Sequence, residues 1–154
     1  MKTAVITGSS RGIGKAIAEE FAKNGYHVIL NASKSADELN DAYEEFLSKG
    51  YSCEAVLADV SDYEECKKLF IKAPDVLVNN AGISHIGLFT DMTPESFKHL
   101  IDVNLMSAFN LSLIHILYSC VIGFNYQPFI IYYRSFSYLA AKAFSISCLS
   151  LKLQ

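Results

Sequence analysis

The chain has 154 residues, of which 51% are hydrophobic and 19% are charged, so it holds enough apolar material for about one domain with a core. Its formal net charge of −3 argues against a nucleic-acid surface, which needs clustered Lys and Arg. The apolar run in the opening MKTAVITG is too short for a signal peptide, and the four cysteines form no C-x-x-C pair. We therefore expect a cytoplasmic chain with reduced thiols, two disulfides being the alternative.

Short apolar runs alternate with amphipathic segments along most of the chain. The runs have the composition of buried parallel strands and cover residues 3–7, 27–30, 53–58 and 75–79. Helices are predicted after Gly12, after Ser35 and Ser61 (each opening an S-x-x-E capping box), and after the Thr93-Pro94 pair. This order predicts an α/β fold with a doubly wound parallel sheet of the Rossmann type, carrying helices on both faces.

A glycine-rich turn joins the first predicted strand to the first predicted helix. Residues 7–14 read TGSSRGIG. Gly8 permits a tight turn, Gly12 lets the backbone approach a pyrophosphate, and Gly14 lets the helix pack close to the strand. The helix N-terminus offers free N–H groups and the positive end of its dipole to phosphates. We predict a nucleotide site at this turn, and the absence of Gly-Lys-Ser/Thr excludes a Walker phosphate loop.

The end of the second predicted strand indicates which dinucleotide is bound. A site that prefers NAD usually places Asp or Glu about 20 residues past the glycines. Here that count reaches Lys34, and the nearby Asp37 is better explained as a first-turn helix charge. Ser33, Lys34 and Arg11 can together receive a 2′-phosphate. We therefore predict NADP, with NAD less favoured.

Four motifs together resemble the short-chain dehydrogenase/reductase family. TGSSRGIG matches its T-G-x-x-x-G-x-G cofactor turn, LADV (57–60) its adenine-contacting segment, NNAG (79–82) its fourth-strand signature, and VNL contains the family's asparagine as Asn104. AGIS and TPESF look most like the bacterial 3-oxoacyl-[acyl-carrier-protein] reductase branch. The dinucleotide contacts implied by the motifs and the basic residues are Gly8, Ser10, Arg11, Gly12, Ile13, Gly14, Ser33, Lys34, Asp59, Val60, Asn80, Ala81 and Gly82.

The resemblance implies hydride transfer between a nicotinamide and a carbonyl or alcohol, and the reductase branch suggests a 3-oxoacyl thioester on an acyl carrier as the substrate. In the family a Y-x-x-x-K pair serves this chemistry, the Lys lowering the pKa of the Tyr that exchanges the proton. Asn104 is expected to bend a helix and anchor a water of the proton relay. Intact relatives are expected to be homo-oligomeric, and no metal is expected.

The composition changes abruptly near residue 112. All 16 acidic residues and 10 of the 13 basic ones precede Leu113, whereas the tail is rich in aromatic residues. We therefore divide the chain into an NAD(P)-binding domain, residues 1–112, incomplete at its C-terminal side, and a tail, residues 113–154, foreign to that fold.

The tail contains one candidate for the catalytic pair, Tyr138 with Lys142. Because the tail holds several tyrosines, a chance match is a serious alternative. The family's serine is expected about a dozen residues before the tyrosine, and Asn125 stands there instead. The second hypothesis is therefore a dinucleotide-binding chain without turnover.

Two further explanations of the tail remain open. Residues 113–133 are long enough for a membrane span, but Asn125, Gln127 and Pro128 lie inside them, so we expect no membrane partner. Residues 111–116 read LSLIHI, the translation of CTG TCT CTT ATA CAC ATC, a transposon mosaic end used in sequencing-library preparation. On this hypothesis the reading frame crosses an adapter junction near Asn110 into unrelated or out-of-frame sequence.

Overall fold

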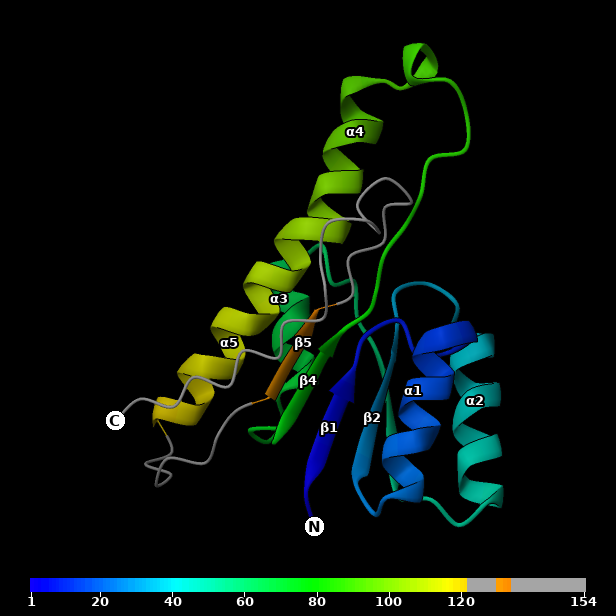
Figure 1. Cartoon of the computed structure of the whole chain (residues 1–154), viewed down its shortest axis with the longest axis vertical. Coiled ribbons are helices and arrows are strands. Elements are labelled where there is room, and N and C mark those ends of the chain that lie inside the picture. The colour runs from blue at the N-terminus through cyan, green and yellow to red at the C-terminus, as the bar shows by residue number, and fades with distance from the viewer. Residues whose placement is uncertain (122–129, 134–154) are drawn as a thin grey trace.

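The computed structural model describes residues 1–121 and 130–133, with side chains described through residue 117. A parallel sheet has the strand order β3-β2-β1-β4-β5 (Figure 1). Its strands are β1 (Thr3–Ile6), β2 (His27–Ala32), β3 (Cys53–Leu57), β4 (Val76–Asn79) and β5 (Ile130–Tyr133). The α/β fold class predicted from the sequence is confirmed. The strand β5 was not among the predicted strands.

Helices cover both faces of this sheet. They are α1 (Gly12–Lys23), α2 (Ala36–Ser48), α3 (Tyr63–Cys66) continued by the 3₁₀ turn η1 (Lys67–Leu69), then the 3₁₀ turn η2 (Phe89–Asp91), α4 (Pro94–Ile101), the π-helical turn η3 (Asp102–Met106) and α5 (Ser107–Val121). Helices α1 and α2 lie together on one face, and α3 and α5 on the other (Figure 1).

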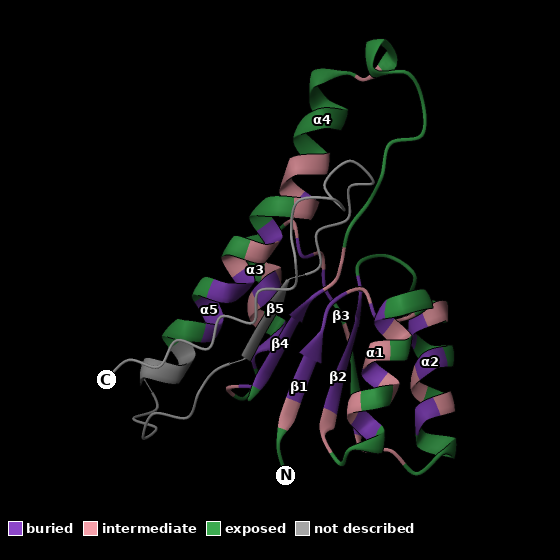
Figure 2. Cartoon of the chain, in the orientation of Figure 1, coloured by how far each residue is buried: buried purple, intermediate pink, exposed green. Residues whose placement is uncertain are grey.

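Alternation along the strands explains the two layers. In β1, Ala4 and Ile6 pack with Ala18 of α1 and Phe46 of α2, whereas Val5 faces the second layer. That layer contains Leu69, Phe70, Leu111 and Ile114 among its buried residues. Successive residues of a strand point to opposite faces, so each central strand must be apolar on both. Figure 2 shows the central strands buried along most of their length.

Two of the three predicted helix caps differ in detail from the prediction. Thr93 caps α4 as expected, its side chain accepting a hydrogen bond from the Ser96 N–H, with Pro94 at the first helical position. The cap of α3 is Asp62, which accepts from two backbone N–H groups, and not Ser61. Ser35 is the N-cap of α2 by position, but its side chain makes no capping hydrogen bond.

Helices α4 and α5 form one continuous helical run through η3. Residues Pro94–Leu117, 24 in number, contain an 18-residue window of mean hydropathy 1.5, so this run is long and apolar enough to cross a membrane by length and composition alone. Core helices of soluble proteins pass the same test, and Leu111 and Ile114 are buried against the sheet. The run continues without a break past residue 112, where the sequence placed a domain boundary. That boundary stays a prediction.

Candidate cofactor site

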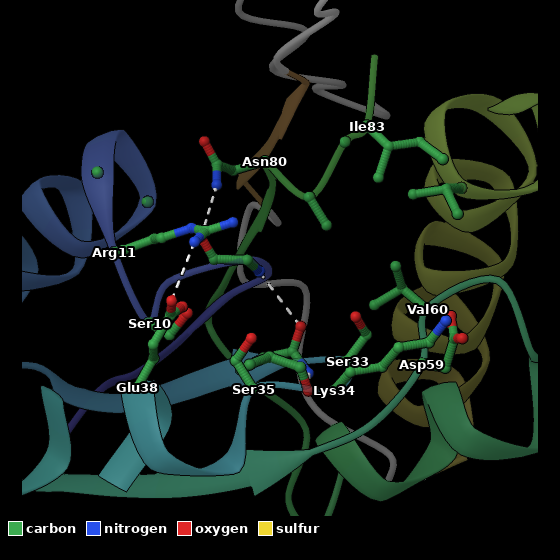
Figure 3. A pocket seen from close by; sticks show the side chains of 18 of the residues that line it. Ser10, Arg11, Ser33, Lys34, Ser35, Glu38, Asp59, Val60, Asn80 and Ile83 are labelled. Carbon is green, nitrogen blue, oxygen red and sulfur yellow. Dashed lines mark hydrogen bonds and ion pairs between the residues drawn. The ribbon is translucent and has the colours of Figure 1, made fainter. Parts of the chain in front are cut away.

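A cavity of about 570 Å³ opens where the carboxyl ends of the strands meet. Its walls come from the β1–α1 turn, the end of β2, the start of α2, the segments after β3 and β4, and α4 (Figure 3). The chain reverses its direction of winding between β1 and β4, since β2 lies on one side of β1 and β4 on the other. In open α/β sheets, ligands bind in the crevice at such a switch point.

All thirteen residues predicted to contact the dinucleotide line this cavity, although they come from four separate segments of the sequence. The lining residues are Gly8, Ser10, Arg11, Gly12, Ile13, Gly14, Ser33, Lys34, Asp59, Val60, Asn80, Ala81 and Gly82. The structure adds eight that were not predicted as cofactor contacts: Asn31, Ala32, Ser35, Glu38, Ile83, Ser84, His99 and Val103. The contacts of these residues with a cofactor stay predictions.

The three glycines of the β1–α1 turn meet different constraints. Gly8 and Gly12 have φ angles of +63° and +56°, in the left-handed region that L side chains rarely adopt. A Cβ on Gly14 would lie 2.2 Å from the carbonyl oxygen of Gly8 and 2.5 Å from Nδ2 of Asn80, so the helix can approach this closely only with glycine here. A Cβ on Gly12 would meet no atom within 4 Å. The turn is therefore tightly packed at Gly14, against Gly8 and Asn80, and has open space at Gly12.

The N-terminus of α1 is free to bind an anion. The helix begins at Gly12, and Arg11 at its N-cap makes no side-chain capping bond. The N–H groups of the first helical turn have no intrahelical partner, and those of Gly12, Ile13 and Gly14 belong to residues that line the cavity. Open space at Gly12 beside these donors fits the phosphates of a dinucleotide.

Thr7 fixes the turn to the strand beside it. The buried Thr7 hydroxyl donates to the carbonyl of Val78 at 3.3 Å and accepts from the backbone N–H groups of Asn80 and Ala81, each at 3.0 Å. The side-chain amide of Asn80 donates to the carbonyls of Thr7 (2.8 Å) and Gly8 (3.2 Å). These bonds hold the glycine turn and the segment after β4 at a fixed separation.

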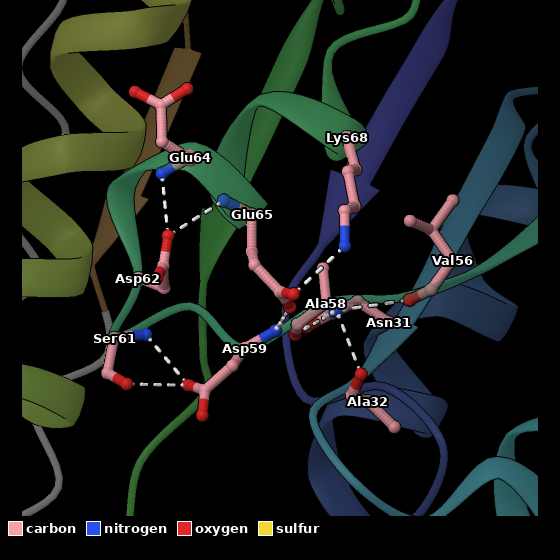
Figure 4. Close-up of polar contacts among 10 residues, drawn as sticks. All are labelled: Asn31, Ala32, Val56, Ala58, Asp59, Ser61, Asp62, Glu64, Glu65 and Lys68. Carbon is pink, nitrogen blue, oxygen red and sulfur yellow. Dashed lines mark hydrogen bonds and ion pairs between the residues drawn. The ribbon is translucent and has the colours of Figure 1, made fainter.

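Asn31 fixes the same turn to the other side of the cavity. Its side-chain Oδ1 accepts from the Gly8 N–H at 3.2 Å. Its Nδ2 donates to the carbonyls of Val56 (3.2 Å) and Ala58 (3.0 Å), as Figure 4 shows. Asn31 is 1% exposed. A buried amide must find partners, so a lone Asn inside the apolar run HVILNA was a signal that our sequence reasoning overlooked.

Asp59 lies at the far wall of the cavity, after β3. Its Oδ1 accepts from the backbone N–H (2.9 Å) and the hydroxyl (2.7 Å) of Ser61, while its own N–H donates to Glu65 Oε2 (2.7 Å) (Figure 4). Partial burial opposes ionisation, but the two bonds from Ser61, aided by the charges of Lys34 and His99, lower the pKa of the Asp59 carboxyl. Asp59 is therefore an oriented carboxylate acceptor at neutral pH.

A basic corner, made of Arg11, Ser33, Lys34 and Ser35, lies between the glycine turn and Asp59. It is not purely basic, because Glu38 of α2 lines the cavity there as well. Glu38 Oε1 lies 3.0 Å from Arg11 Nη1 (Figure 3). The carboxylate that the S-x-x-E pattern assigned to a capping box thus bridges α2 to the start of α1.

Asn104 lies outside the cavity lining, in the π-helical turn η3. Its Oδ1 accepts from the Ile83 N–H and its Nδ2 donates to the Ile83 carbonyl, both at 2.8 Å. Both bonds anchor the segment after β4 to the helix. Both parts of the expectation for Asn104, that it bends a helix and that it anchors a water of the proton relay, stay predictions.

The part of the chain whose side chains the structure describes contains no group that could bind a metal and no reactive cysteine. No group of three or more His, Cys, Asp and Glu side chains there could hold a metal. Cys53 and Cys66 are buried and unpaired. Burial raises the pKa of both thiols, that of Cys66 to about 12, so neither is a reactive thiolate. Tyr138 and Lys142 lie outside the described residues.

Comparison with known proteins assigns the family. A family model described as short chain dehydrogenase matches residues 2–118. The chain belongs to the short-chain dehydrogenase/reductase family. This short-chain dehydrogenase/reductase is 38% identical over 117 residues to the oxidoreductase UcpA of Salmonella typhimurium, covering 72% of this chain and 44% of that protein. It is also 38% identical over 115 residues to 3-oxoacyl-[acyl-carrier-protein] reductase FabG of Staphylococcus aureus, covering 71% and 47%.

Solved structures of other family members agree. L-sorbose reductase from Gluconobacter frateurii, complexed with NADPH and L-sorbose, superposes with a TM-score of 0.72 at 33% identity, covering 79% of this chain and 49% of that one. A short-chain dehydrogenase from Burkholderia cenocepacia in complex with NADP gives 0.69 at 30% identity, covering 76% and 50%. The short-chain dehydrogenase/reductase described here thus spans about half the length of the relatives it matches.

Proposed function

We propose that this chain binds NADP(H) and serves hydride transfer between the nicotinamide and a carbonyl or alcohol. The observation that carries the proposal is the cavity at the switch point, with free N–H groups of α1 and a basic corner on one wall. The Gly12–Gly14 turn would hold the phosphates, and Asp59 with Val60 the adenine. Asn80–Gly82 would lie toward the nicotinamide, and bound NADPH supplies the hydride.

NADP is proposed over NAD because of the charge at the end of β2. Neither the last residues of β2 nor the next position, Ser33, is an Asp or Glu, whose carboxylate would accept a hydrogen bond from the 2′-hydroxyl of NAD. Arg11 and Lys34 both line the basic corner and would supply positive charge to a 2′-phosphate. The relatives complexed with NADP or NADPH support the same choice.

The substrate class is part of the proposal. A small carbonyl or alcohol, free or carried as a 3-oxoacyl thioester, is suggested by the 38% identity to the acyl-carrier-protein reductase. A cytoplasmic location belongs to the same proposal. The test is NADPH oxidation by the purified full chain with a panel of ketones and 3-oxoacyl thioesters. Turnover that Tyr138→Phe abolishes supports the reductase, and turnover that survives this change contradicts the assignment of the proton donor.

A second candidate is dinucleotide binding without turnover. It is favoured by Asn125, which stands where the family's serine is expected. Titration of NADPH fluorescence with the protein separates the candidates. Saturable binding with no NADPH oxidation on any substrate supports this second candidate, whereas no binding contradicts both.

A further inference from the structure

Glu38 is an acidic side chain in a corner otherwise built for an anion. Its carboxylate lies 3.0 Å from the Arg11 guanidinium, and both side chains line the cavity beside Ser33, Lys34 and Ser35 (Figure 3). Glu38 therefore occupies part of the coordination that Arg11 would offer to a phosphate.

A comparison of the charged side chains that line the cavity shows how much of the positive charge of the basic corner Glu38 neutralises. Among the described lining residues, Arg11 and Lys34 are the basic side chains apart from His99, and Glu38 and Asp59 are the carboxylates. Asp59 lies after β3, with one oxygen held by Ser61. Glu38 is thus the carboxylate paired with Arg11, and it cancels about half of the positive charge of the basic corner.

The ion pair between Glu38 and Arg11 is not required for the stability of the fold. Both side chains are exposed, 77% for Arg11 and 44% for Glu38, and exposed ion pairs contribute little to stability. Glu38 is the fourth residue of the S-x-x-E pattern, from which it could reach back to the N-cap of α2. A weak pair beside an anion site exchanges partners easily, so Arg11 can leave Glu38 for an arriving phosphate.

We infer that Glu38 is a specificity-determining residue that weakens the preference for a 2′-phosphorylated dinucleotide. It competes with the phosphate for Arg11, and after the exchange its carboxylate faces the phosphate as a like charge. The inference rests on the proposed dinucleotide site. It assigns to Glu38 a selective effect on the 2′-phosphate, with little effect on the rest of the cofactor.

The probes are adenosine 2′,5′-bisphosphate and adenosine 5′-monophosphate, which differ by the 2′-phosphate and need only the adenosine half of the site. Their dissociation constants are measured by calorimetry on the full chain. Glu38→Gln removes the charge at nearly constant volume. The matched control is Asp37→Asn, which removes one carboxylate from the same first turn of α2, at a position outside the cavity lining.

We expect Glu38→Gln to tighten the bisphosphate about tenfold, since one unit charge a few ångströms from a phosphate is worth roughly that factor in water. The monophosphate should change by less than about twofold, as should both probes in Asp37→Asn, whose charge is screened by solvent. In an Arg11→Gln background the gain from Glu38→Gln should shrink, because the competition for Arg11 is gone.

Three results would overturn the inference. The first is a bisphosphate affinity that Glu38→Gln leaves unchanged or weakens, which would make Glu38 a support for Arg11. The second is an equal gain for both probes, and the third is an equal gain in Asp37→Asn, since either would reflect general charge. If the unmodified chain binds neither probe, the proposed site itself fails, and the role of Glu38 fails with it.

Discussion

Gly14 is the position where the structure makes its sharpest prediction about the glycine turn. A Cβ placed there would lie 2.2 Å from the Gly8 carbonyl oxygen and 2.5 Å from Asn80 Nδ2. Atoms in folded proteins essentially never approach a Cβ closer than 3.0 Å, so α1 must move away from the turn. Gly14→Ala therefore disturbs both the β1–α1 junction and the position of Asn80.

Two effects of opposite sign compete in Gly14→Ala. Helix propensity favours Ala over Gly by up to about 1 kcal/mol within a helix. Forcing an extra methyl group into a packed site costs about 1–3 kcal/mol, and here the first obstacle is backbone, which cannot rotate aside. We expect the variant to lose about 1–2 kcal/mol of unfolding free energy and to bind adenosine 2′,5′-bisphosphate more weakly.

The measurement is urea unfolding followed by far-ultraviolet circular dichroism, together with calorimetric binding. Gly25→Ala is the control, because Gly25 has a φ of +80° with no atom within 4 Å of a Cβ and lies at the opposite end of α1. It should lose about 1–2 kcal/mol through backbone strain alone and keep its ligand affinity. A Gly14→Ala variant as stable as the unmodified chain, with unchanged affinity, would refute the close approach.

Three further predictions concern stability. Thr7→Val should cost about 1–3 kcal/mol of unfolding free energy, measured in urea, because it leaves the N–H groups of Asn80 and Ala81 without their acceptor. The control is the same change at the partly buried Thr3, which should cost under about 0.5 kcal/mol in the same measurement. Hydrogen bonds from Lys15 and Lys49 lower the pKa of Glu45 to about 2, so the ionised Glu45 stabilises the fold above pH 4.5, and this contribution is lost as the pH falls toward 2. The urea midpoint should therefore depend less steeply on pH between 4.5 and 2 in Glu45→Gln than in the unmodified chain. An equally steep dependence in both proteins would contradict the ion pairing of Glu45. Burial lowers the pKa of His115 despite its hydrogen bond to the Pro74 carbonyl at 2.7 Å. The unfolded chain therefore takes up the proton at a higher pH than the folded chain does, and the melting temperature should fall as the pH drops below 6.5. His115→Gln should reduce that fall, and equal falls in both proteins would show that His115 is not buried.

Much of the fold was predictable because its signals are local. Apolar runs such as HVIL gave the strands, and TGSSRGIG gave the turn together with the wall of the cavity that it forms. Parallel strands bring their carboxyl ends to one edge, so residues far apart in sequence were expected at one site, and the lining of the cavity agrees.

Side-chain direction was not predictable from spacing. The pattern Ser35–Glu38 fits a capping box and equally a carboxylate that faces outward, and the choice depends on Arg11, which lies 27 residues away in sequence. Ser61 and Asp62 are both good caps, and Ser61 is instead engaged by Asp59. The competing partner of Glu38 is tertiary, whereas that of Ser61 is only two residues away, and Asp62 makes the capping bonds of α3 in its place.

The later part of the chain was harder to predict for a different reason. A short apolar run fits a strand or a helix segment equally well, so Ile130–Tyr133, which pairs in parallel with β4, gave no clear signal. The composition change at residue 112 placed a boundary inside α5, whose buried residues Leu111 and Ile114 lie on either side of it. The domain boundary itself stays a prediction, because composition alone does not determine which residues of a helix contact a sheet.

Hydrogen exchange with NADPH tests the central claim most directly, because it locates the ligand on the backbone. The account predicts that saturating NADPH protects the amides of Gly12–Gly14 and of the Asn80–Ile83 segment, while those of α2 beyond its first turn exchange as before. Protection confined to other segments, or no protection at any concentration, would contradict a dinucleotide site at the β1–α1 turn.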